Sequence, residues 1–417
     1  MKKIVFITFA LSLFFIHAFA GKHNNDEPFL IQKFPISSIT NVDVKTDIGN
    51  VKIDGDATNE AEVKVFIRRC NSDDQVAKEE IEELLNDNYE IEIKVEKGTL
   101  FAYAKKKKSN IKKELSIGFE ISVGSKVDGQ VKTDVGSISV NNIQGKVKGN
   151  TGVGSVRINK CDGDINLNTG VGSVHVSELK GAADVSTGSG SIKAENISAK
   201  LTAKTNVGSL RFGNITGSLN GSTGSGSIHL ENIQNDAELA TNIGSISAKK
   251  CSGKLKLNSN SGSIKLKEID GNINAATSVG SLTLADLTGD INVQTNSGSV
   301  QANNLKGEIV LGTSVGSFTA KNISGNLDAK TGTGSVSIEM TNVEKHLRLN
   351  TSSVGSIKVV LPKEKGYDLK VKGGKIKSLK NFKGIFETGN IDGEIGNGGA
   401  QVSITANGNN NIEFSLK

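Results

Sequence analysis

A glycine followed by a serine recurs every 18 residues across residues 133–335 of this chain, and the interval never varies. A fixed period of this length is typical of folds that are built from stacked structural repeats. The repeat therefore constrains the fold more than any other feature of the sequence. The glycines of the series are Gly136, Gly154, Gly172, Gly190, Gly208, Gly226, Gly244, Gly262, Gly280, Gly298, Gly316 and Gly334.

Within each unit, apolar and polar residues alternate as they do along a β-strand. Counted from the glycine, the second and fourth positions are apolar, as in Ile228 and Leu230, and the third is polar. A second alternation follows at the eleventh and thirteenth positions, as in Leu255 and Leu257. A Thr, replaced once by Ser259, precedes each glycine by three residues with the same inward parity. One unit therefore predicts two strands and two turns, in halves of nine residues.

A single coil of this kind is not stable alone, because burial of its few aliphatic side chains does not offset the entropy lost by ordering its backbone. Neighbouring coils add ladder hydrogen bonds and a shared core, so stability grows with the number of repeats. We predict an all-β chain, a parallel β-solenoid of 18-residue coils with a small α+β N-terminal cap and an irregular C-terminal cap.

From Val207 to Val315 the residue just before the glycine alternates between large and small in successive units, as in Val207, Ser225, Ile243 and Ser261. Two explanations fit this 36-residue pattern. One is close packing in a narrow internal column, and the other is duplication of a two-coil block.

The sequence predicts four segments. Residues 1–20 have the features of a secretory signal peptide: Lys2 and Lys3, an apolar core, and Ala18-Phe19-Ala20 before Gly21. The apolar run is too short for a good membrane span. Residues 21–125 are expected to form N-terminal strands, a helix and a hairpin. The regular solenoid is expected over residues 126–360, and irregular C-terminal coils over 361–417.

The helix is expected near residues 73–87, where Ser72 and Gln75 form a capping box before an apolar stripe. Residues 46–53, around Gly49, read as a degenerate copy of the repeat, and residues 388–391 and 412–416 as final, imperfect coils.

These features together resemble the bacterial putative-adhesin family, which are β-strand-repeat envelope proteins of unknown function. The resemblance rests on the strands around Gly49, the helix, the repeated T-x-x-G-S-hydrophobic units and the Leu361-Pro362 step. It covers most of residues 40–417 and implies a parallel β-solenoid in an exported or envelope protein. It provides no catalytic residues. The chain departs from the family in the length and uniformity of its repeats and in having no membrane anchor.

Residues with reactive or metal-binding side chains are scattered. Cys161 and Cys251 share an apolar column five coils apart, too far for a disulfide. His175 and His229 share an outward column three coils apart, too far for one zinc ion. Aspartates are dispersed among lysines and asparagines without a visible catalytic pair. We therefore expect no catalytic residues, metal site or cofactor.

The nearest feature to a binding site is the outward third position of the repeat. A rigid sheet would hold these side chains about 4.8 Å apart in one line, and their charge would attract an anionic polymer. The alternative is a solvated face that keeps the protein soluble, since Glu195 and Glu231 lie beside it. We call this column the cationic stripe; its residues are Arg157, His175, Lys193, Arg211, His229 and Lys265.

These observations favour an exported, non-enzymatic solenoid that acts as an envelope scaffold or adhesion surface. The expected partners are anionic glycans or envelope surface components, with no nucleic acid. The expected location is the periplasm, the cell surface or the exterior. Two alternatives stay open: a carbohydrate-active enzyme with its site in the irregular ends, and an ice-binding solenoid with a flat Thr/Ser face.

Overall fold

The structure, a computed structural model, describes residues 26–70, 77–352, 355–376, 382–387, 389–407 and 410–417. The chain divides into two compact units, residues 1–207 and 208–417. The predicted signal peptide and the predicted capping box of Ser72 and Gln75 lie outside the described residues.

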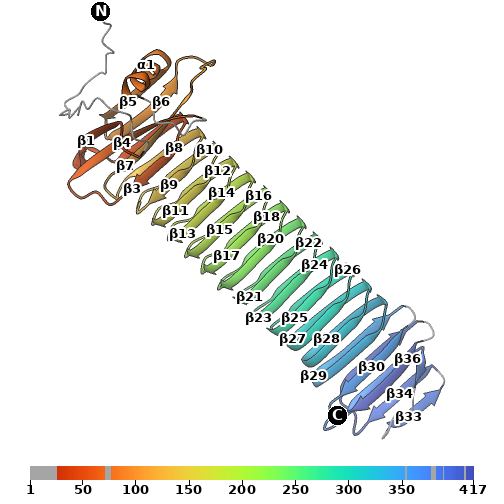
Figure 1. The fold of residues 1–417 in the computed structure, drawn as a ribbon. Coiled ribbons are helices and arrows are strands. Elements are labelled where there is room, and N and C mark those ends of the chain that lie inside the picture. The colour runs from red at the N-terminus through yellow and green to blue at the C-terminus, as the bar shows by residue number, and fades with distance from the viewer. Residues whose placement is uncertain (1–25, 71–76, 353–354, 377–381, 388, 408–409) are drawn as a thin grey trace, which may run out of the picture. The chain divides into compact units, whose positions relative to one another are not determined.

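The coils of unit 1 consist of two ladders of short parallel strands (Figure 1). Partners in each ladder are 18 residues apart, as Val147 and Ile165 are, so the sequence period equals one turn of a solenoid. The first ladder contains β8 (Asp128–Val135), β10 (Val147–Val153), β12 (Ile165–Val171), β14 (Ala183–Ser189) and β16 (Leu201–Val207). The second contains β9 (Ile138–Asn141), β11 (Val156–Cys161), β13 (Val174–Leu179) and β15 (Ile192–Ile197).

The side chains predicted to face inward form the core. Val156, Ile158 and Cys161 on β11 are at most 1% exposed, and so are their counterparts on β13. The prediction of a parallel β-solenoid with 18-residue coils is therefore confirmed.

The first part of unit 1 joins this solenoid through β2 and β3. These strands pair in parallel with β8 and β9 on one side and with β6 and β7 on the other. Thr46 lies opposite Thr133, so the degenerate copy around Gly49 takes the register of a coil. The elements are β1 (Leu30–Pro35), η1 (Ile36–Ser38), β2 (Asn41–Ile48), β3 (Val51–Asp54), β4 (Glu60–Arg69), α1 (Lys78–Asn88), β5 (Tyr89–Glu96), β6 (Thr99–Lys106) and β7 (Leu115–Ser122).

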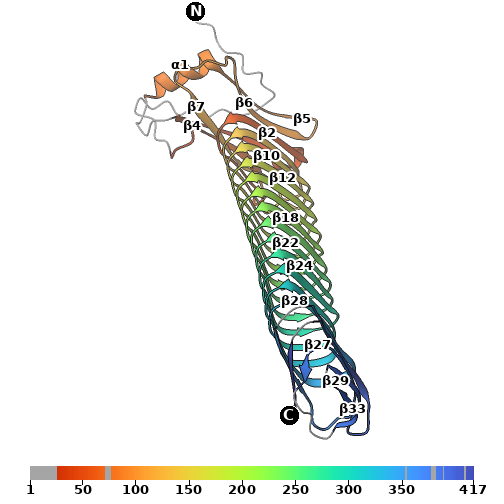
Figure 2. The same cartoon turned by 90° about the vertical axis from the view of Figure 1, so that its right-hand side faces the viewer.

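Antiparallel pairs complete this region. Strand β4 pairs with β1 and β7, and β5 pairs with β6 as the expected hairpin. Helix α1 lies outside the coils (Figure 2), contacts β5 and buries Ile81. The described part of the helix begins at Lys78, and Ala77 provides no side-chain cap.

Unit 2 continues the same two-ladder pattern in its own strands. One ladder contains β17 (Leu210–Ile215), β19 (Ile228–Ile233), β21 (Ile246–Ser252), β23 (Ile264–Asp270) and β25 (Leu282–Thr288). The other contains β18 (Leu219–Ser225), β20 (Ala237–Ile243), β22 (Leu255–Ser261), β24 (Ile273–Val279) and β26 (Ile291–Ser297). Both end on β27 (Val300–Val315), which β28 (Phe318–Thr333) and β29 (Val336–Thr351) follow. In these three long strands the turn between the two halves has become continuous strand.

The C-terminal region of unit 2 is irregular. Strand β36 pairs in parallel with β30, as the final coil predicted over 412–416 requires. The coil predicted over 388–391 is wrong for its described residues, because β34 pairs antiparallel with both β31 and β33. The strands are β30 (Ser356–Leu361), β31 (Tyr367–Lys372), β32 (Lys375–Ile376), β33 (Phe382–Glu387), β34 (Asn390–Ile395), β35 (Ala400–Ala406) and β36 (Asn411–Leu416).

The recurring glycine is required by the spacing between coils. Gly154 has φ +159°, and a Cβ atom there would lie 2.0 Å from the carbonyl oxygen of Gly136 in the preceding coil. The buried threonine hydroxyl uses the same carbonyl: Thr151 Oγ1 donates a 2.8 Å hydrogen bond to Gly136 O. Each coil is thus connected to the one before it at this corner.

The opposite turn is also regular. The sixth residue after the glycine has a left-handed φ of 52–58° in every coil from Asn142 to Asn322. Asparagine tolerates this conformation better than other side chains do. The asparagines that recur at this position therefore serve the turn, and they also bond to one another: Asn232 Nδ2 donates a 2.7 Å hydrogen bond to Asn214 Oδ1.

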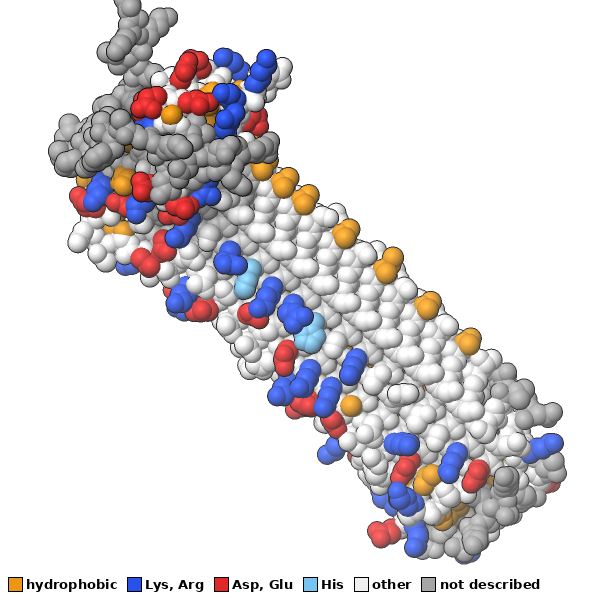
Figure 3. Space-filling view, in the orientation of Figure 1, with side chains coloured by type: hydrophobic (Ala, Val, Ile, Leu, Met, Phe, Trp, Pro, Cys, Tyr) orange, Lys and Arg blue, Asp and Glu red, His pale blue; other side chains and the backbone are white. Residues whose placement is uncertain are grey.

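The large–small alternation before the glycine is not internal packing. The large members are 46–63% exposed and stand out on a mostly polar surface (Figure 3). Close packing in a narrow column is therefore the wrong explanation for them. The exposed Val and Ile residues at this position are Val135, Val153, Val171 and Val207 in unit 1, and Ile243, Val279 and Val315 in unit 2.

Candidate binding surface

The cationic stripe has one part in each unit. In unit 1, Arg157 lies directly opposite His175, and His175 directly opposite Lys193, on β11, β13 and β15. All three side chains point away from the core, because the residues on either side of each are buried. Strand spacing places their backbones about 4.8 Å apart. The structure thus brings together these three residues, which the sequence predicted to share one outward column.

In unit 2 the column holds Arg211 opposite His229, then Ser247, then Lys265. The structure adds a second column of cations two residues along the same strands, where Lys249 lies opposite Lys267. The sequence contained this signal at the fifth position of the repeat. In unit 1 that position holds Asn, Ser and Glu, so it did not stand out.

Carboxylates moderate the stripe in unit 1. Lys193 Nζ lies 2.8 Å from Glu195 Oε2, and His175 Nε2 lies 4.0 Å from the same oxygen. The pKa of His175 is nevertheless lowered, chiefly by partial burial and then by the positive charges of Lys193 and Arg157, against the opposing effect of Glu195. The imidazole therefore experiences a net positive environment.

The cysteines are not paired with one another. Cys70, Cys161 and Cys251 are free thiols. Burial raises the pKa of Cys161 and Cys251, which makes them poor nucleophiles. No cluster of three or more His, Cys, Asp or Glu side chains suited to a metal ion occurs among the described residues.

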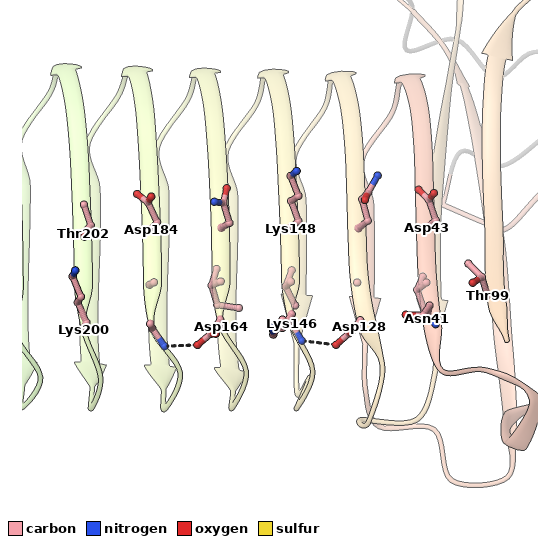
Figure 4. Close-up of a pocket in the computed structure, with 18 of the residues that line it drawn as sticks. Asn41, Asp43, Thr99, Asp128, Lys146, Lys148, Asp164, Asp184, Lys200 and Thr202 are labelled. Atoms are coloured by element: carbon pink, nitrogen blue, oxygen red, sulfur yellow. Dashed lines mark hydrogen bonds between the residues drawn. The ribbon is translucent and has the colours of Figure 1, made fainter.

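A groove that the sequence analysis missed lies on the outer face of the other ladder in unit 1. Its volume is about 860 Å³, and its lining comes from β2, β6, β8, β10, β12, β14 and β16. One line of outward residues crosses it, each directly opposite the next on the neighbouring strand (Figure 4). We call this line the groove row; it contains Phe101, Asp43, Gln130, Lys148, Asn166, Asp184 and Thr202.

Polar contacts order one end of the groove. Tyr103 donates a 2.6 Å hydrogen bond to Asp43 Oδ2, and Lys45 Nζ lies 3.1 Å from both that oxygen and the Tyr103 hydroxyl. The other carboxylate oxygen, Asp43 Oδ1, is buried and has no hydrogen-bond partner among the described residues. An unpaired buried polar atom costs about 1–3 kcal/mol, so this oxygen is an acceptor that a donor would stabilise.

Two further aspartates of the groove are committed to the fold. Asp128 Oδ1 accepts a 2.8 Å hydrogen bond from the backbone N–H of Lys146, and Asp164 Oδ1 accepts one of 3.0 Å from that of Ala182 (Figure 4). Asp236 does the same for Lys254 in unit 2. These carboxylates satisfy turn N–H groups of the next coil, and this explains why they recur at one position of the repeat.

Comparison with known proteins identifies the second part of the chain. Residues 245–413 match the family model described as Toastrack DUF4097. This segment is therefore similar to the Toastrack family. The resemblance to an adhesin-like β-strand-repeat family of unknown function is thereby confirmed over the Toastrack segment.

A solved structure, titled as that of a putative cell adhesion protein from Clostridium sporogenes ATCC 15579, is also similar to the chain. It is 11% identical, and the match covers 92% of this chain and 98% of that one with a TM-score of 0.17. No curated protein matches the chain. Among the described residues, none of the helices is long and apolar enough to cross a membrane.

Proposed function

We propose that this protein is an exported, non-catalytic scaffold at the cell envelope whose cationic stripe binds anionic polysaccharide. The register of Arg157, His175 and Lys193 carries this proposal, because it places outward basic side chains at the same position of successive strands. A linear polymer with regularly spaced carboxylates meets such a column repeatedly along its length. Export rests on the signal-like residues 1–20.

A scaffold fits the rest of the surface better than an enzyme does. Asp128, Asp164 and Asp236 each accept a backbone N–H at a turn, so these carboxylates support the coils. The family named in the match to residues 245–413 supplies no reaction to transfer.

Ice binding through the threonine column has less support. The threonines of this column are at most 5% exposed, and their hydroxyls donate to glycine carbonyls of the preceding coil, as Thr169 Oγ1 does to Gly154 O at 2.8 Å. A face that orders water needs its hydroxyl groups at the surface.

The test is retention of the mature protein in native gels that contain polygalacturonate. Retention should be strong at low salt and decrease as salt is raised, because screening weakens attraction between exposed charges. Changing Arg157, Lys193, Arg211 and Lys265 together to Glu should abolish it.

A variant with the same change in net charge provides the control. Lys132, Lys204, Lys256 and Lys330 are exposed and belong to the other ladder in each unit, and their joint change to Glu should leave most retention in place. Thermal melts should show that both variants are folded. Equal loss of retention in the two variants would mean that net charge, and not the stripe, attracts the polymer.

A further inference from the structure

We propose that the groove on the outer face of unit 1 is a second binding site, and that its ligand is a neutral, linear polysaccharide. The site is independent of the cationic stripe. It uses the ladder that contains β10 and β12, whereas the unit 1 part of the stripe lies on β11, β13 and β15.

The shape of the groove suits an extended chain. Its row of outward residues runs across seven neighbouring strands from Phe101 on β6 to Thr202 on β16. Successive positions are about 4.8 Å apart, so a polymer lying along the row meets a new side chain at each strand. A volume of about 860 Å³ falls in the range of pockets that hold ligands.

The charges of the groove are close to balanced. Its lining contains four aspartates, of which Asp128 and Asp164 are bonded to backbone N–H groups, and the three lysines Lys146, Lys148 and Lys200. Acidic and basic groups alternate along it with Gln130 and Asn166 between them. A strongly charged polymer gains little from such a surface, whereas the hydroxyl groups of a neutral sugar find both donors and acceptors.

An aromatic side chain stands at one end. Phe101 is half-buried, and its ring is held edge-on to Tyr103 with centroids 5.5 Å apart. Lys94 Nζ lies 5.8 Å from the Phe101 centroid. A ring fixed in this way offers an apolar surface for the C–H face of a sugar. Beside it, the Asp43 carboxylate is held by the Tyr103 hydroxyl and Lys45.

Affinity electrophoresis in gels that contain hydroxyethyl cellulose or galactomannan tests the site. We expect retention by at least one of these neutral polymers, at low and at high salt alike. The change Phe101→Ala should weaken retention about tenfold, since an aromatic contact of this kind is worth about that factor.

A matched pair separates the groove from the rest of the sheet. Asn166 lines the groove, and Asn168, two residues further along β12, faces the same side outside it. Asn166→Ala and Asp184→Ala, which both change surface residues of the groove, should each weaken retention, and Asn168→Ala should not. These two groove variants keep the test decisive even if Phe101→Ala fails to fold.

Three results would overturn the proposal: no retention by either polymer, equal retention of the Asn166→Ala and Asn168→Ala variants, or retention that salt and the stripe variant abolish. The last result would place all binding on the stripe. Conversely, if the unchanged protein were retained by a neutral polymer but not by polygalacturonate, only the proposed function of the stripe would be contradicted.

Discussion

At the scale of single residues, the close approach of each coil to the one before it requires a glycine, which has no Cβ atom. The repeat glycine brings its backbone so close to the preceding coil that a Cβ atom has no room, and its φ of about 150° is one that other residues rarely adopt. The threonine hydroxyl completes the contact from the next coil. Glycine and threonine recur together because the glycine leaves room beside the carbonyl oxygen of the preceding coil and the threonine hydroxyl donates a hydrogen bond to it.

This gives a first prediction. Gly298→Ala would place Cβ 2.1 Å from Gly280 O at φ +154° and should cost about 2–4 kcal/mol of unfolding free energy. Gly312→Ala is the control, because its nearest atoms are 3.6 and 3.8 Å away. That change should be neutral or stabilise by up to about 1 kcal/mol. Denaturant melts of the two variants measure the difference, and equal stability would contradict the steric explanation.

Residue-level prediction from sequence was good for the core and incomplete for the turns. Inward columns follow from alternation alone, because a strand has only two faces. The left-handed turn position was visible only through its asparagines. Lys160, Glu178 and Asp286 occupy the same conformation, and these residue types carry no signal for it. The alternation in size before the glycine suggested internal packing, because a size pattern alone does not show whether the side chains face the core or the solvent.

At the scale of strands, the stripe in unit 1 is a set of cross-strand neighbours whose charges influence one another. His175 reports on them. Its folded pKa is lowered below the usual 6.5, so the unfolded chain binds its proton more tightly. The stabilising contribution of neutral His175 is complete above about pH 6.5 and decreases as pH falls toward the lowered pKa.

The second prediction concerns Lys193, the neighbour of His175 on the next strand. Lys193→Gln removes a positive charge and frees Glu195, so the pKa of His175 should rise. Lys204→Gln, on the other ladder, should leave it unchanged. Titration of the histidine ring protons by nuclear magnetic resonance, assigned with His175→Gln, measures both. An unchanged pKa in Lys193→Gln would show that the column is electrostatically uncoupled.

The groove shows what the repeat alone does not determine. Its row begins at Phe101, on a hairpin strand that belongs to no repeat and joins the ladder through β2. Gln130, Lys148, Asn166, Asp184 and Thr202 are 18 residues apart, so the period alone aligns them. Asp43 and Phe101 join the line only through the pairing of β2 with β8 and β6. The antiparallel pairing of β34 likewise depends on partners far from the repeat pattern.

At the scale of the whole molecule, the period should permit changes in length only by complete turns. Deleting residues 263–280 leaves Gly262 followed by Ser281, which has the same position in its coil as Ser263. Deleting only residues 263–271 sets every later column half a turn out of place. The first variant should keep a β-sheet spectrum and a cooperative melt, and the second should lose both. Circular dichroism provides both measurements, and equal tolerance of the two deletions would contradict the 18-residue coil.

The stripe column varies from coil to coil. Glycine, threonine and the inward aliphatic residues provide the contacts between coils, while the third position holds Arg, His, Lys, Ser, Thr or Gln in different coils. Each side chain of the column can therefore be substituted on its own, while the contacts between coils stay the same. One backbone could therefore be reprogrammed, coil by coil, to recognise polymers of a different charge pattern.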